Sequence, residues 1–517
     1  MSEFHDQMAE AYGHDGPTVR LGRPYPEPGA IDTGVEVGIP LGLLNRHGLI
    51  AGATGTGKTK TLQLMAEQIS AAGCPVFAAD MKGDLAGIAR PGEASDPVKE
   101  RVAELAQDWQ PQGAPVELMS LTGEEGVALR ASVSSFGPDL LSKVMNLNET
   151  QASSLSLIFR FCEEGGLPLI ELEDLRAALA YLVGPGKDEL GDLGGVSKAT
   201  VGVIQRKVSE LEGDGGDIFF GEPEFDISEL LATAEDGRGI VSLLDLTGVA
   251  TQPKLFSTFL MWVLGELFAD LPEVGDPDKP ELVFFFDEAH LLFDDAPDAF
   301  LDAVAQTVRL IRSKGVGVFF VTQLPTDLPE EVLSQLGHRV QHAVRAFTPK
   351  DARALKAAVD TFPITEHYDL EETLTQLGVG EAAVTVLDER GVPTAVAATR
   401  LYAPASRMAP LTDEERDEII DTSELFDKYE ERVDRESAEE MLAAKLAGDR
   451  ERAAELREEA VRERPEPSAP RGKRRRSRST NRRTKSTEEQ LLGQATKFLN
   501  SRQGQKVVRG LLGMLKR

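Results

Sequence analysis

The segment Leu49-Ile-Ala-Gly-Ala-Thr-Gly-Thr-Gly-Lys-Thr-Lys60 decides the fold class of this sequence. It contains the pattern G-x-x-x-x-G-K-[ST] from Gly52 to Thr59, with an apolar run before it and apolar residues at helical spacing over 60–69 after it. A strand, a glycine-rich loop and a helix in this order bind phosphate, because the loop N–H groups and the amino end of the helix face the same anion. The segment therefore predicts a nucleotide-binding α/β fold.

Each residue type in this loop has a task in such a site. Glycines permit the tight backbone turn, Lys58 reaches the β- and γ-phosphates, and the Thr59 hydroxyl binds Mg²⁺. ATP and Mg²⁺ are therefore the expected cofactors. The residues expected to contact the nucleotide are Gly52, Ala53, Thr54, Gly55, Thr56, Gly57, Lys58, Thr59 and Lys60.

A second apolar run, Glu281-Leu-Val-Phe-Phe-Phe-Asp-Glu-Ala-His290, contains two adjacent carboxylates near its end. The run is too short to cross a membrane and suits the central strand of a parallel sheet that is covered on both faces. At its end, Asp287 is expected to hold Mg²⁺ through water and Glu288 to polarise the water that attacks the γ-phosphate. An ordinary solvated turn is the alternative, and the phosphate loop upstream favours the catalytic interpretation.

A third apolar run, Gly-Val-Phe-Phe-Val-Thr, ends at Gln323. Gln323 is expected beside the Glu288 strand, where its amide senses the γ-phosphate or orients water. The helix predicted over 300–314 carries Arg309 and Arg312 three residues apart, hence on one face. Either arginine suits an arginine finger that acts across a subunit boundary, and a solvated cationic face is the equal alternative.

Four segments together resemble the HerA/FtsK superfamily of ring-forming, DNA-pumping P-loop ATPases. They are the phosphate-loop segment 46–59, the box Phe-Asp-Glu-Ala-His at 286–290, the segment Arg-Ser-Lys-Gly-Val-Gly-Val-Phe-Phe-Val-Thr-Gln-Leu-Pro at 312–325, and Gln-His-Ala-Val-Arg-Ala-Phe-Thr-Pro at 341–349. The combination is specific although each piece is not, it covers most of residues 30 to 400, and it is most similar to the bacterial HerA-like branch. The resemblance implies a RecA-like core, a homo-hexameric ring and ATP-driven movement of double-stranded DNA.

The resemblance also assigns roles to arginines. In HerA-like proteins the arginine just before the phosphate-loop strand acts on the nucleotide of its own chain, which corresponds to Arg46. The arginine that acts in trans lies on the helix before the glutamine strand, which implies Arg309 or Arg312, with Arg345 as a weaker candidate. HerA proper has a β-barrel before the phosphate loop, whereas 51 residues precede Gly52 here. The resemblance therefore does not imply that this chain docks a nuclease such as NurA through a β-barrel.

Two further features are interpreted without a catalytic role. The tetrapeptide Asp-Glu-Ala-His also occurs in DEAH helicases, but those pair two RecA-like cores in one chain. This sequence has one phosphate loop, so His290 is interpreted as a packing or capping residue. A predicted strand ends in the turn 80–84, at a place where parallel strands present functional loops. Lys82 or Asp84 is placed to touch nucleotide or DNA there, and a plain turn is the preferred interpretation.

Composition suits a large cytoplasmic protein. The 517 residues are 41% hydrophobic and carry a net charge of −30, and the two cysteines give no disulfide framework, which fits a reducing compartment. The acidic start Met-Ser-Glu-Phe-His-Asp lacks the basic and apolar parts of a signal peptide. We therefore expect a cytoplasmic chain without a transmembrane anchor.

Charge is distributed unevenly along the chain. Residues 471–517 contain 15 Lys or Arg and 2 Asp or Glu, so the other 470 residues have a net charge of −43. An acidic body repels DNA at long range, so contact with double-stranded DNA is expected from a basic ring pore or from this tail. The alternatives for the tail are a spacer or a segment that folds back on the acidic body. The last part of it suits docking to a protein partner or, less economically, an anionic membrane.

The predicted domain organisation follows these landmarks. Helical patterns dominate between two parts of the core, and a region rich in Ala, Glu and Arg follows the core. The expected parts are a disordered lead-in at 1–30, the RecA-like core at 31–136 and 216–410, a helical insertion at 137–215, a charged helical region at 411–464, a basic disordered linker at 465–486 and an amphipathic segment at 487–517.

Three functions of different classes are consistent with these features. The leading hypothesis is a hexameric, ATP-driven DNA translocase or helicase-like motor. The alternatives are an ATPase that remodels protein or nucleoprotein complexes and a nucleotide-gated scaffold, in which ATP binding only assembles a ring. Stimulation of hydrolysis by DNA separates the first from the second, and turnover above background separates both from the third.

Overall fold

The computed structural model describes residues 2–462 except 124, 191–194, 250–252, 276, 294–297 and 347. The chain divides into two compact units, residues 1–450 and 451–517, and the fold and the sites below belong to the first unit. The predicted linker at 465–486 and the predicted amphipathic segment at 487–517 lie outside the described residues.

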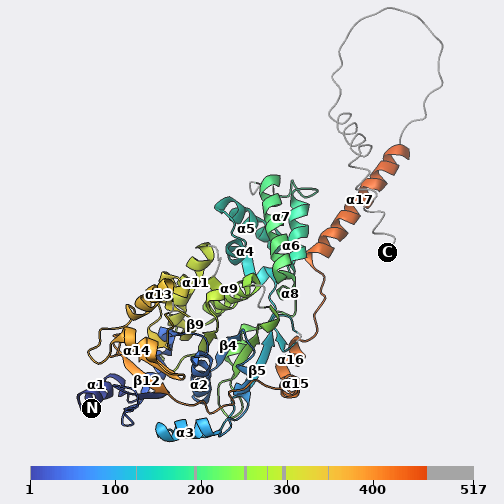
Figure 1. The fold of residues 1–517 in the computed structure, drawn as a ribbon. Coiled ribbons are helices and arrows are strands. Elements are labelled where there is room, and N and C mark those ends of the chain that lie inside the picture. The colour runs from blue at the N-terminus through green and yellow to red at the C-terminus, as the bar shows by residue number, and fades with distance from the viewer. Residues whose placement is uncertain are drawn as a thin grey trace, which may run out of the picture. The chain divides into compact units, whose positions relative to one another are not determined.

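Twelve strands among the described residues form one sheet, in the order β2-β1-β12-β11-β10-β3-β9-β8-β4-β7-β5-β6 (Figure 1). The eight strands from β10 to β6 are parallel, and the other four are antiparallel to their neighbours. The strands are β1 (Thr18–Pro24), β2 (Val37–Pro40), β3 (Gly48–Ala51), β4 (Val76–Asp80), β5 (Val116–Ser120), β6 (Val127–Ala128), β7 (Val241–Asp245), β8 (Leu282–Phe286), β9 (Val316–Thr322), β10 (His338–Gln341), β11 (Glu381–Thr385) and β12 (Ala397–Leu401).

Helices surround this sheet, and none of those described is both long and apolar enough to cross a lipid bilayer. They are α1 (Ser2–Tyr12), α2 (Lys58–Ala71), α3 (Asp96–Glu104), α4 (Val133–Val144), α5 (Glu149–Glu164), α6 (Leu172–Leu182), α7 (Lys198–Leu211), α8 (Asp217–Phe219), α9 (Pro253–Asp270), α10 (His290–Phe293), α11 (Asp298–Ile311), α12 (Glu330–Leu333), α13 (Pro349–Val359), α14 (Leu370–Gln376), α15 (Asp413–Asp421), α16 (Glu424–Tyr429) and α17 (Ala438–Arg462).

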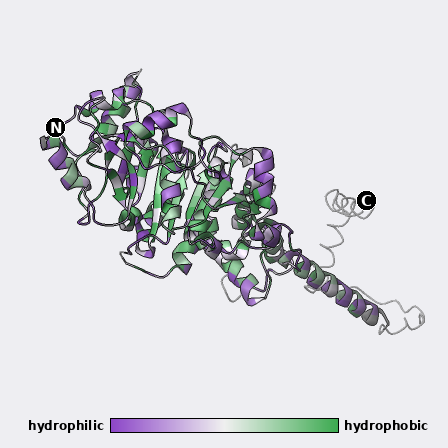
Figure 2. Ribbon diagram, turned by 90° about the horizontal axis from the view of Figure 1, so that it is seen from below, coloured by the Kyte–Doolittle hydropathy of each residue, from purple (hydrophilic) through white to green (hydrophobic). Residues whose placement is uncertain are grey.

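Strand β8 shows why the parallel centre is buried on both faces. All five of its side chains are buried, and alternate residues belong to different hydrophobic clusters. Val283 and Phe285 pack with residues of α2, whereas Phe284 and Phe286 pack with residues of α9 and α11. Successive side chains of a strand point to opposite faces, so this apolar run is a covered central strand, as predicted. Figure 2 shows hydrophobic residues gathered along the strands of the sheet.

The stretch predicted as a helical insertion contains α5, α6, α7 and most of α4, which Figure 1 shows grouped together. Polar side chains fix where these helices begin, because an oxygen of Ser132, Asn148 or Ser197 accepts a hydrogen bond from a free N–H in the first turn of α4, α5 or α7. Their buried residues join the cluster that includes α9 on one face of the sheet. The insertion thus extends one core of the sheet.

Residues 2–24 are structured, which corrects the expected disordered lead-in at 1–30. Phe4, Met8 and Tyr12 recur every fourth residue on α1 and are at most 4% exposed, so α1 packs against the sheet through one apolar stripe. The Tyr12 hydroxyl donates a hydrogen bond to the carbonyl oxygen of Val384 at 2.9 Å. β1 then enters the sheet between β12 and β2. The sequence does not predict this helix, because only three widely spaced large apolar residues mark its buried face in an acidic segment.

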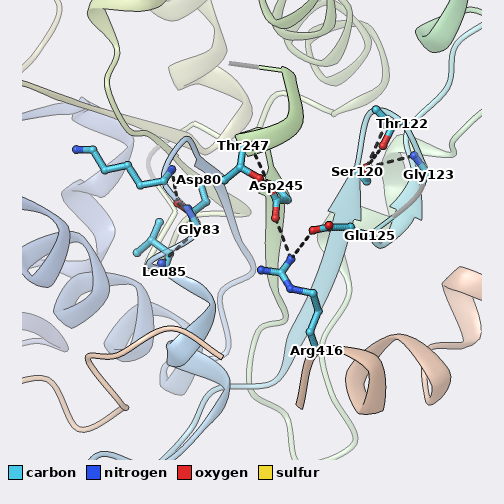
Figure 3. A network of polar contacts seen from close by, with 11 residues as sticks. Asp80, Gly83, Leu85, Ser120, Thr122, Gly123, Glu125, Asp245, Thr247 and Arg416 are labelled. Atoms are coloured by element: carbon cyan, nitrogen blue, oxygen red, sulfur yellow. Dashed lines mark hydrogen bonds and ion pairs between the residues drawn. The ribbon is translucent and has the colours of Figure 1, made fainter. Parts of the chain in front are cut away.

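The segment after the core packs back onto the carboxyl ends of β7 and β5. Arg416 of α15 forms an ion pair with Asp245 at 2.8 Å and with Glu125 at 3.3 Å, and Figure 3 shows its guanidinium between the two carboxylates. Tyr429, at the end of α16, is 1% exposed. α15 and α16 are therefore attached to the sheet by both charge and burial.

Candidate active site

The phosphate-loop segment joins β3 to α2 in the predicted order of strand, loop and helix. Gly52, Gly55 and Gly57 have φ angles of +150°, +78° and +114°, a region that residues with a Cβ rarely adopt. At Gly52 a Cβ would also lie 2.5 Å from the Cβ of His342. The three glycines therefore determine the shape of the loop. In this shape, the N–H groups of the loop and the amino end of α2 face the same anion.

Lys58 begins α2 and is turned back into the loop. Its Nζ donates a hydrogen bond to the carbonyl oxygen of Gly52 at 2.8 Å and a longer one to that of Ala53 at 3.4 Å. The residue is 7% exposed. Burial lowers the pKa of the Lys58 ammonium, and the Glu288 carboxylate opposes this shift. A buried cation beside neutral carbonyl oxygens favours an anion next to it, which a phosphate supplies.

Asp287 directly follows β8 and is 1% exposed. Its Oδ1 accepts a hydrogen bond from the backbone N–H of Glu288 at 2.9 Å, whereas Oδ2 has no hydrogen-bond partner among the described residues. Burial raises the pKa of the Asp287 carboxyl to about 6, against the lowering effect of the Lys82 charge. An orphaned, buried carboxylate oxygen at this place fits a hydrated divalent cation.

Glu288 has a φ of +46°, a left-handed conformation that is strained for a glutamate. Its Oε1 accepts a hydrogen bond from Nζ of Lys82, and its Oε2 lies 3.4 Å from Nδ1 of His290. Burial alone would raise the pKa of this carboxyl, but the hydrogen bond and charge of Lys82 and the charge of Lys58 outweigh it, and the pKa is lowered. The carboxylate is thus held in the charged form that accepts a proton.

The turn after β4 fixes the position of Lys82. The carboxylate of Asp80 accepts hydrogen bonds from the backbone N–H groups of Lys82, Gly83 and Leu85 at 3.1, 2.8 and 2.9 Å (Figure 3). Because β4 pairs in parallel with β8, this turn lies beside Glu288. The plain-turn interpretation missed the contact, since it joins residues 206 positions apart. The signal in the sequence is a lysine just after a predicted parallel strand.

Gln323 directly follows β9, which pairs with β3 on one side and with β8 on the other. This confirms the expected position of Gln323 beside the strand of Glu288. The backbone carbonyl of Gln323 accepts a hydrogen bond from the N–H of Gly52 at 3.1 Å, and its side chain is exposed. Gln323 therefore lies between the phosphate loop and the acidic pair.

His342 supports the phosphate loop from behind and was not selected from the sequence. It follows β10, its Nε2 lies 2.9 Å from the Thr61 hydroxyl, and the residue is fully buried. Burial, together with the charge of Lys58, lowers the pKa of His342 to about 3. The ring is therefore neutral and acts as packing and hydrogen-bonding support. Arg345, three residues further on, is exposed.

The described residues offer few ligands for a metal. No group of three or more His, Cys, Asp or Glu among them is arranged to hold one. The half-buried Thr59 in the first turn of α2 and the orphaned oxygen of Asp287 remain as candidates. Mg²⁺ suits this small set, because in nucleotide sites it takes most of its ligands from phosphates and water.

Three of the four arginines selected from the sequence meet at the opposite end of the strands. Arg46, Arg309 and Arg312 line one cavity of about 410 Å³ together with Arg339, and none of the described residues lining it is acidic. His47 also lines it and is 2% exposed, with no hydrogen-bond partner for Nε2 among the described residues. Arg309 and Arg312 thus share one surface, as helical spacing predicted.

The position of Arg46 does not support the cis role that the resemblance implied. β3 separates Arg46 from the phosphate loop and has 4 residues, which corresponds to about 13 Å at the rise of a strand. Residues before a parallel strand lie at one edge of the sheet and residues after it lie at the other. The arginine pocket therefore lies at the other end of β3 from the phosphate loop of its own chain.

The solved structures that are similar to this chain include bacterial proteins. The conjugative coupling protein TrwBΔN70 in its unbound form is 15% identical with a TM-score of 0.50, covering 79% of this chain and 94% of that one. TrwB in complex with a non-hydrolysable ATP analogue is also 15% identical with a TM-score of 0.50, covering 79% of this chain and 95% of that one. VirB4 of Thermoanaerobacter pseudethanolicus is 16% identical with a TM-score of 0.46, covering 77% and 98%. No curated protein matches the sequence.

The similarity to TrwB and the sheet order agree on a RecA-like P-loop ATPase core, which is the fold class that the sequence predicted. The strand carrying Gln323 lies between the phosphate-loop strand and the strand of the acidic pair. The family model described as Helicase HerA-like C-terminal matches residues 28–517. The match spans nearly the whole chain, so this protein belongs to the Helicase HerA-like C-terminal family.

Proposed function

We propose that this protein binds and hydrolyses ATP with Mg²⁺ at the carboxyl ends of β3, β9, β8 and β4. The observation that carries the proposal is the convergence of four side chains at this edge. The four are Lys58, Asp287, Glu288 and Lys82. Lys58 is buried, Asp287 has an oxygen without a hydrogen-bond partner among the described residues, and the Lys82 ammonium keeps the Glu288 carboxylate charged. TrwB, which has the same fold, binds an ATP analogue in one of its structures.

Each group has one task in this proposal. The loop N–H groups and Lys58 bind the phosphates, and Thr59 with Asp287 holds Mg²⁺, which neutralises charge on the phosphate oxygens. Glu288 accepts a proton from the water that attacks the γ-phosphorus, while the bond to the bridging β–γ oxygen breaks and ADP leaves with that electron pair. Gln323 orients this water or senses the γ-phosphate.

The arginine pocket supports a ring. A cavity lined by four arginines and by no acidic residue among those described attracts an anion, and it lies away from the phosphate loop of its own chain. In a homo-hexamer, which we propose as the working assembly, this surface faces the nucleotide of the neighbouring subunit. Arg309 or Arg312 then stabilises the charge that develops on the transferred phosphoryl group.

We further propose that the ring moves along double-stranded DNA. Family membership supports this track, and so does the basic tail at 471–517, which contrasts with a body of net charge −43. Remodelling of protein or nucleoprotein complexes uses the same ATPase site without DNA. A nucleotide-gated scaffold uses ATP only to assemble.

ATP turnover of the full chain with and without duplex DNA tests the track. A DNA motor predicts turnover that rises when duplex DNA is added and falls again with salt, because DNA contacts release counterions. Turnover that DNA leaves unchanged favours remodelling of proteins. Turnover at background in both conditions, with ATP bound, favours the scaffold and contradicts the proposed motor.

A further inference from the structure

A second cavity lies beside the phosphate loop and has no part in the chemistry described above. Its volume is about 230 Å³, and the first residues of the nucleotide-binding helix, Gly57, Lys60 and Thr61, form one of its walls. The opposite walls come from α3 and from the segments around β11 and β12, whose lining side chains are mostly apolar. Val98 of α3 and Tyr402 after β12 are 5% and 7% exposed.

Arg101 gives this cavity a flat, fixed cation. Its Nη1 donates hydrogen bonds to the carbonyl oxygens of Gly380 and Leu401, both at 2.9 Å, and its Nη2 donates to that of Val379 at 3.2 Å. These bonds lie at the edge of the guanidinium, since its N–H groups point outward in its own plane. A guanidinium bound by its edge keeps its faces for stacking on an aromatic ring.

The cavity and the phosphate loop share backbone contacts. The N–H of Gly380 donates a hydrogen bond to the carbonyl oxygen of Thr56 at 3.0 Å, and a Cβ on Gly57 would lie 3.4 Å from the same nitrogen. In a phosphate loop, the α-phosphate of the nucleotide lies near the first turn of the following helix, where Lys60 of α2 lines the cavity. The sugar and base, which are attached to the α-phosphate, therefore extend toward this cavity.

Size and chemistry select the occupant. The cavity is smaller than the roughly 300 Å³ at which pockets for drug-sized ligands begin, so it takes a planar ring system and not a whole nucleotide. Apolar walls with a fixed guanidinium favour an aromatic ring over a sugar or a second phosphate. We propose that this cavity, lined by Val98, Arg101, Val379, Tyr402 and Met408, binds the purine base of the nucleotide, an assignment that rests on the proposed ATP-binding function.

The test compares a ligand that has a base with one that lacks it. Val98→Trp fills the cavity from its buried wall, and Met408→Trp fills it from the rim, where Met408 is 38% exposed and substitution is tolerated by the fold. Val433→Trp, at an exposed valine outside the cavity lining, is the matched control. Dissociation constants are measured by calorimetry for a non-hydrolysable ATP analogue and for inorganic tripolyphosphate, both with Mg²⁺.

The base pocket predicts that both cavity variants bind the ATP analogue about tenfold more weakly or worse, the usual effect of losing one stacked base, while tripolyphosphate binding changes little. Two outcomes would overturn the assignment. In the first, both variants bind the ATP analogue and tripolyphosphate more weakly by the same factor; in the second, both variants unfold cooperatively and bind the ATP analogue as wild type does. Wild-type protein that binds analogue and tripolyphosphate equally well also contradicts the pocket alone. Wild-type protein that binds neither contradicts the proposed ATP-binding function itself.

Discussion

Glu288 keeps a left-handed backbone directly after a buried strand, with φ of +46°. Such a conformation costs about 1–3 kcal/mol for a residue other than glycine and persists where neighbouring contacts enforce it. Two contacts do so here. The N–H of Glu288 donates to Oδ1 of Asp287 at 2.9 Å, and the N–H of Ala289 donates to the carbonyl oxygen of Val321 at 2.9 Å. The strain thus places the carboxylate at the sheet edge, where Lys82 meets it.

Lys82 positions this carboxylate, so its removal should affect the chemical step more than nucleotide binding. We expect Lys82→Ala to lower kcat by about tenfold to a hundredfold, a part of the 10²–10⁴-fold that a positioned general base contributes. KM for ATP should change little, because the hydrogen bond of the Lys82 ammonium is to Glu288. Steady-state ATPase kinetics measure both constants.

Two comparison variants make this prediction specific. Lys82→Arg keeps a cation within reach of Glu288 and should recover part of the lost kcat. Lys207→Ala removes a lysine that also pairs with a carboxylate, Glu210 at 2.7 Å, but on the surface of α7, and should leave kcat unchanged. An increase in KM with normal kcat in Lys82→Ala would show that Lys82 binds nucleotide and does not position the base.

The order of the strands assembles the site from distant parts of the chain. β10, β3, β9, β8 and β4 are consecutive in the sheet, and each ends at the same edge because all are parallel. Their ends carry His342, the phosphate loop, Gln323, the acidic pair and Lys82 in that spatial order. The spatial order of these groups therefore follows from the order of the strands in the sheet.

Sequence alone identifies β3, β8 and β9, because each is a continuous apolar run that ends in polar residues of known chemistry. It offers Lys82 only as an alternative to a plain turn and does not identify His342, because their roles depend on the pairing of β4 with β8 and of β10 with β3. Strand direction decides the position of Arg46 as well. The family resemblance assigned Arg46 to the nucleotide of its own chain. In the structure Arg46 precedes β3, so it lies at the other end of this strand from the phosphate loop.

A partly buried carboxyl couples α16 to the sheet and makes stability depend on pH. The Ser423 hydroxyl, which caps α16, donates a hydrogen bond to Oε1 of Glu117 on β5 at 2.5 Å. Burial raises the pKa of Glu117 from 4.5 to about 7, with the Ser423 bond opposing and the Glu229 charge adding to the shift. A raised folded-state pKa means that the favourable contribution of this group is complete below about 4.5 and is lost as the pH rises through about 7.

Glu117→Gln should therefore be more stable than wild type at pH 8, by at most about 3 kcal/mol, and equal to it near pH 4. The glutamine keeps the size of the side chain and the acceptor for Ser423 but carries no charge to bury. Denaturant unfolding at several pH values measures the difference. Glu371→Gln, at an exposed position of α14, serves as the control. A Glu117→Gln variant that is less stable at pH 8 would contradict the burial argument.

At the scale of the whole molecule, the phosphate loop and the arginine pocket lie at opposite edges of one sheet. In the proposed ring, the site is complete only when a second copy presents its pocket. Arg309 is exposed and Arg312 is partly buried at the end of the helix before β9, and in the proposed ring both face a neighbouring subunit. We therefore propose that assembly and hydrolysis are coupled through the arginines.

Mixing two inactive variants tests this coupling. Arg312→Ala keeps its own Glu288, and Glu288→Gln keeps its own arginines, so a mixed ring contains interfaces in which both groups are intact. We expect the separate variants to be nearly inactive and the mixture to recover part of the wild-type turnover, and the same holds for Arg309→Ala if that arginine acts in trans. Rings shown by mass measurement to be mixed, yet inactive, would indicate a structural or cis role.

The most direct test of the account measures ATP turnover and ATP binding together in wild type, Lys58→Ala and Glu288→Gln. Lys58 binds the phosphates and Glu288 activates the attacking water, so we predict that wild type hydrolyses ATP and that Lys58→Ala binds it weakly. Glu288→Gln should bind ATP with wild-type affinity and turn it over about 10²-fold or more slowly, the contribution of a general base. Turnover in Glu288→Gln close to that of wild type would contradict the assignment of this edge of the sheet as the site of hydrolysis.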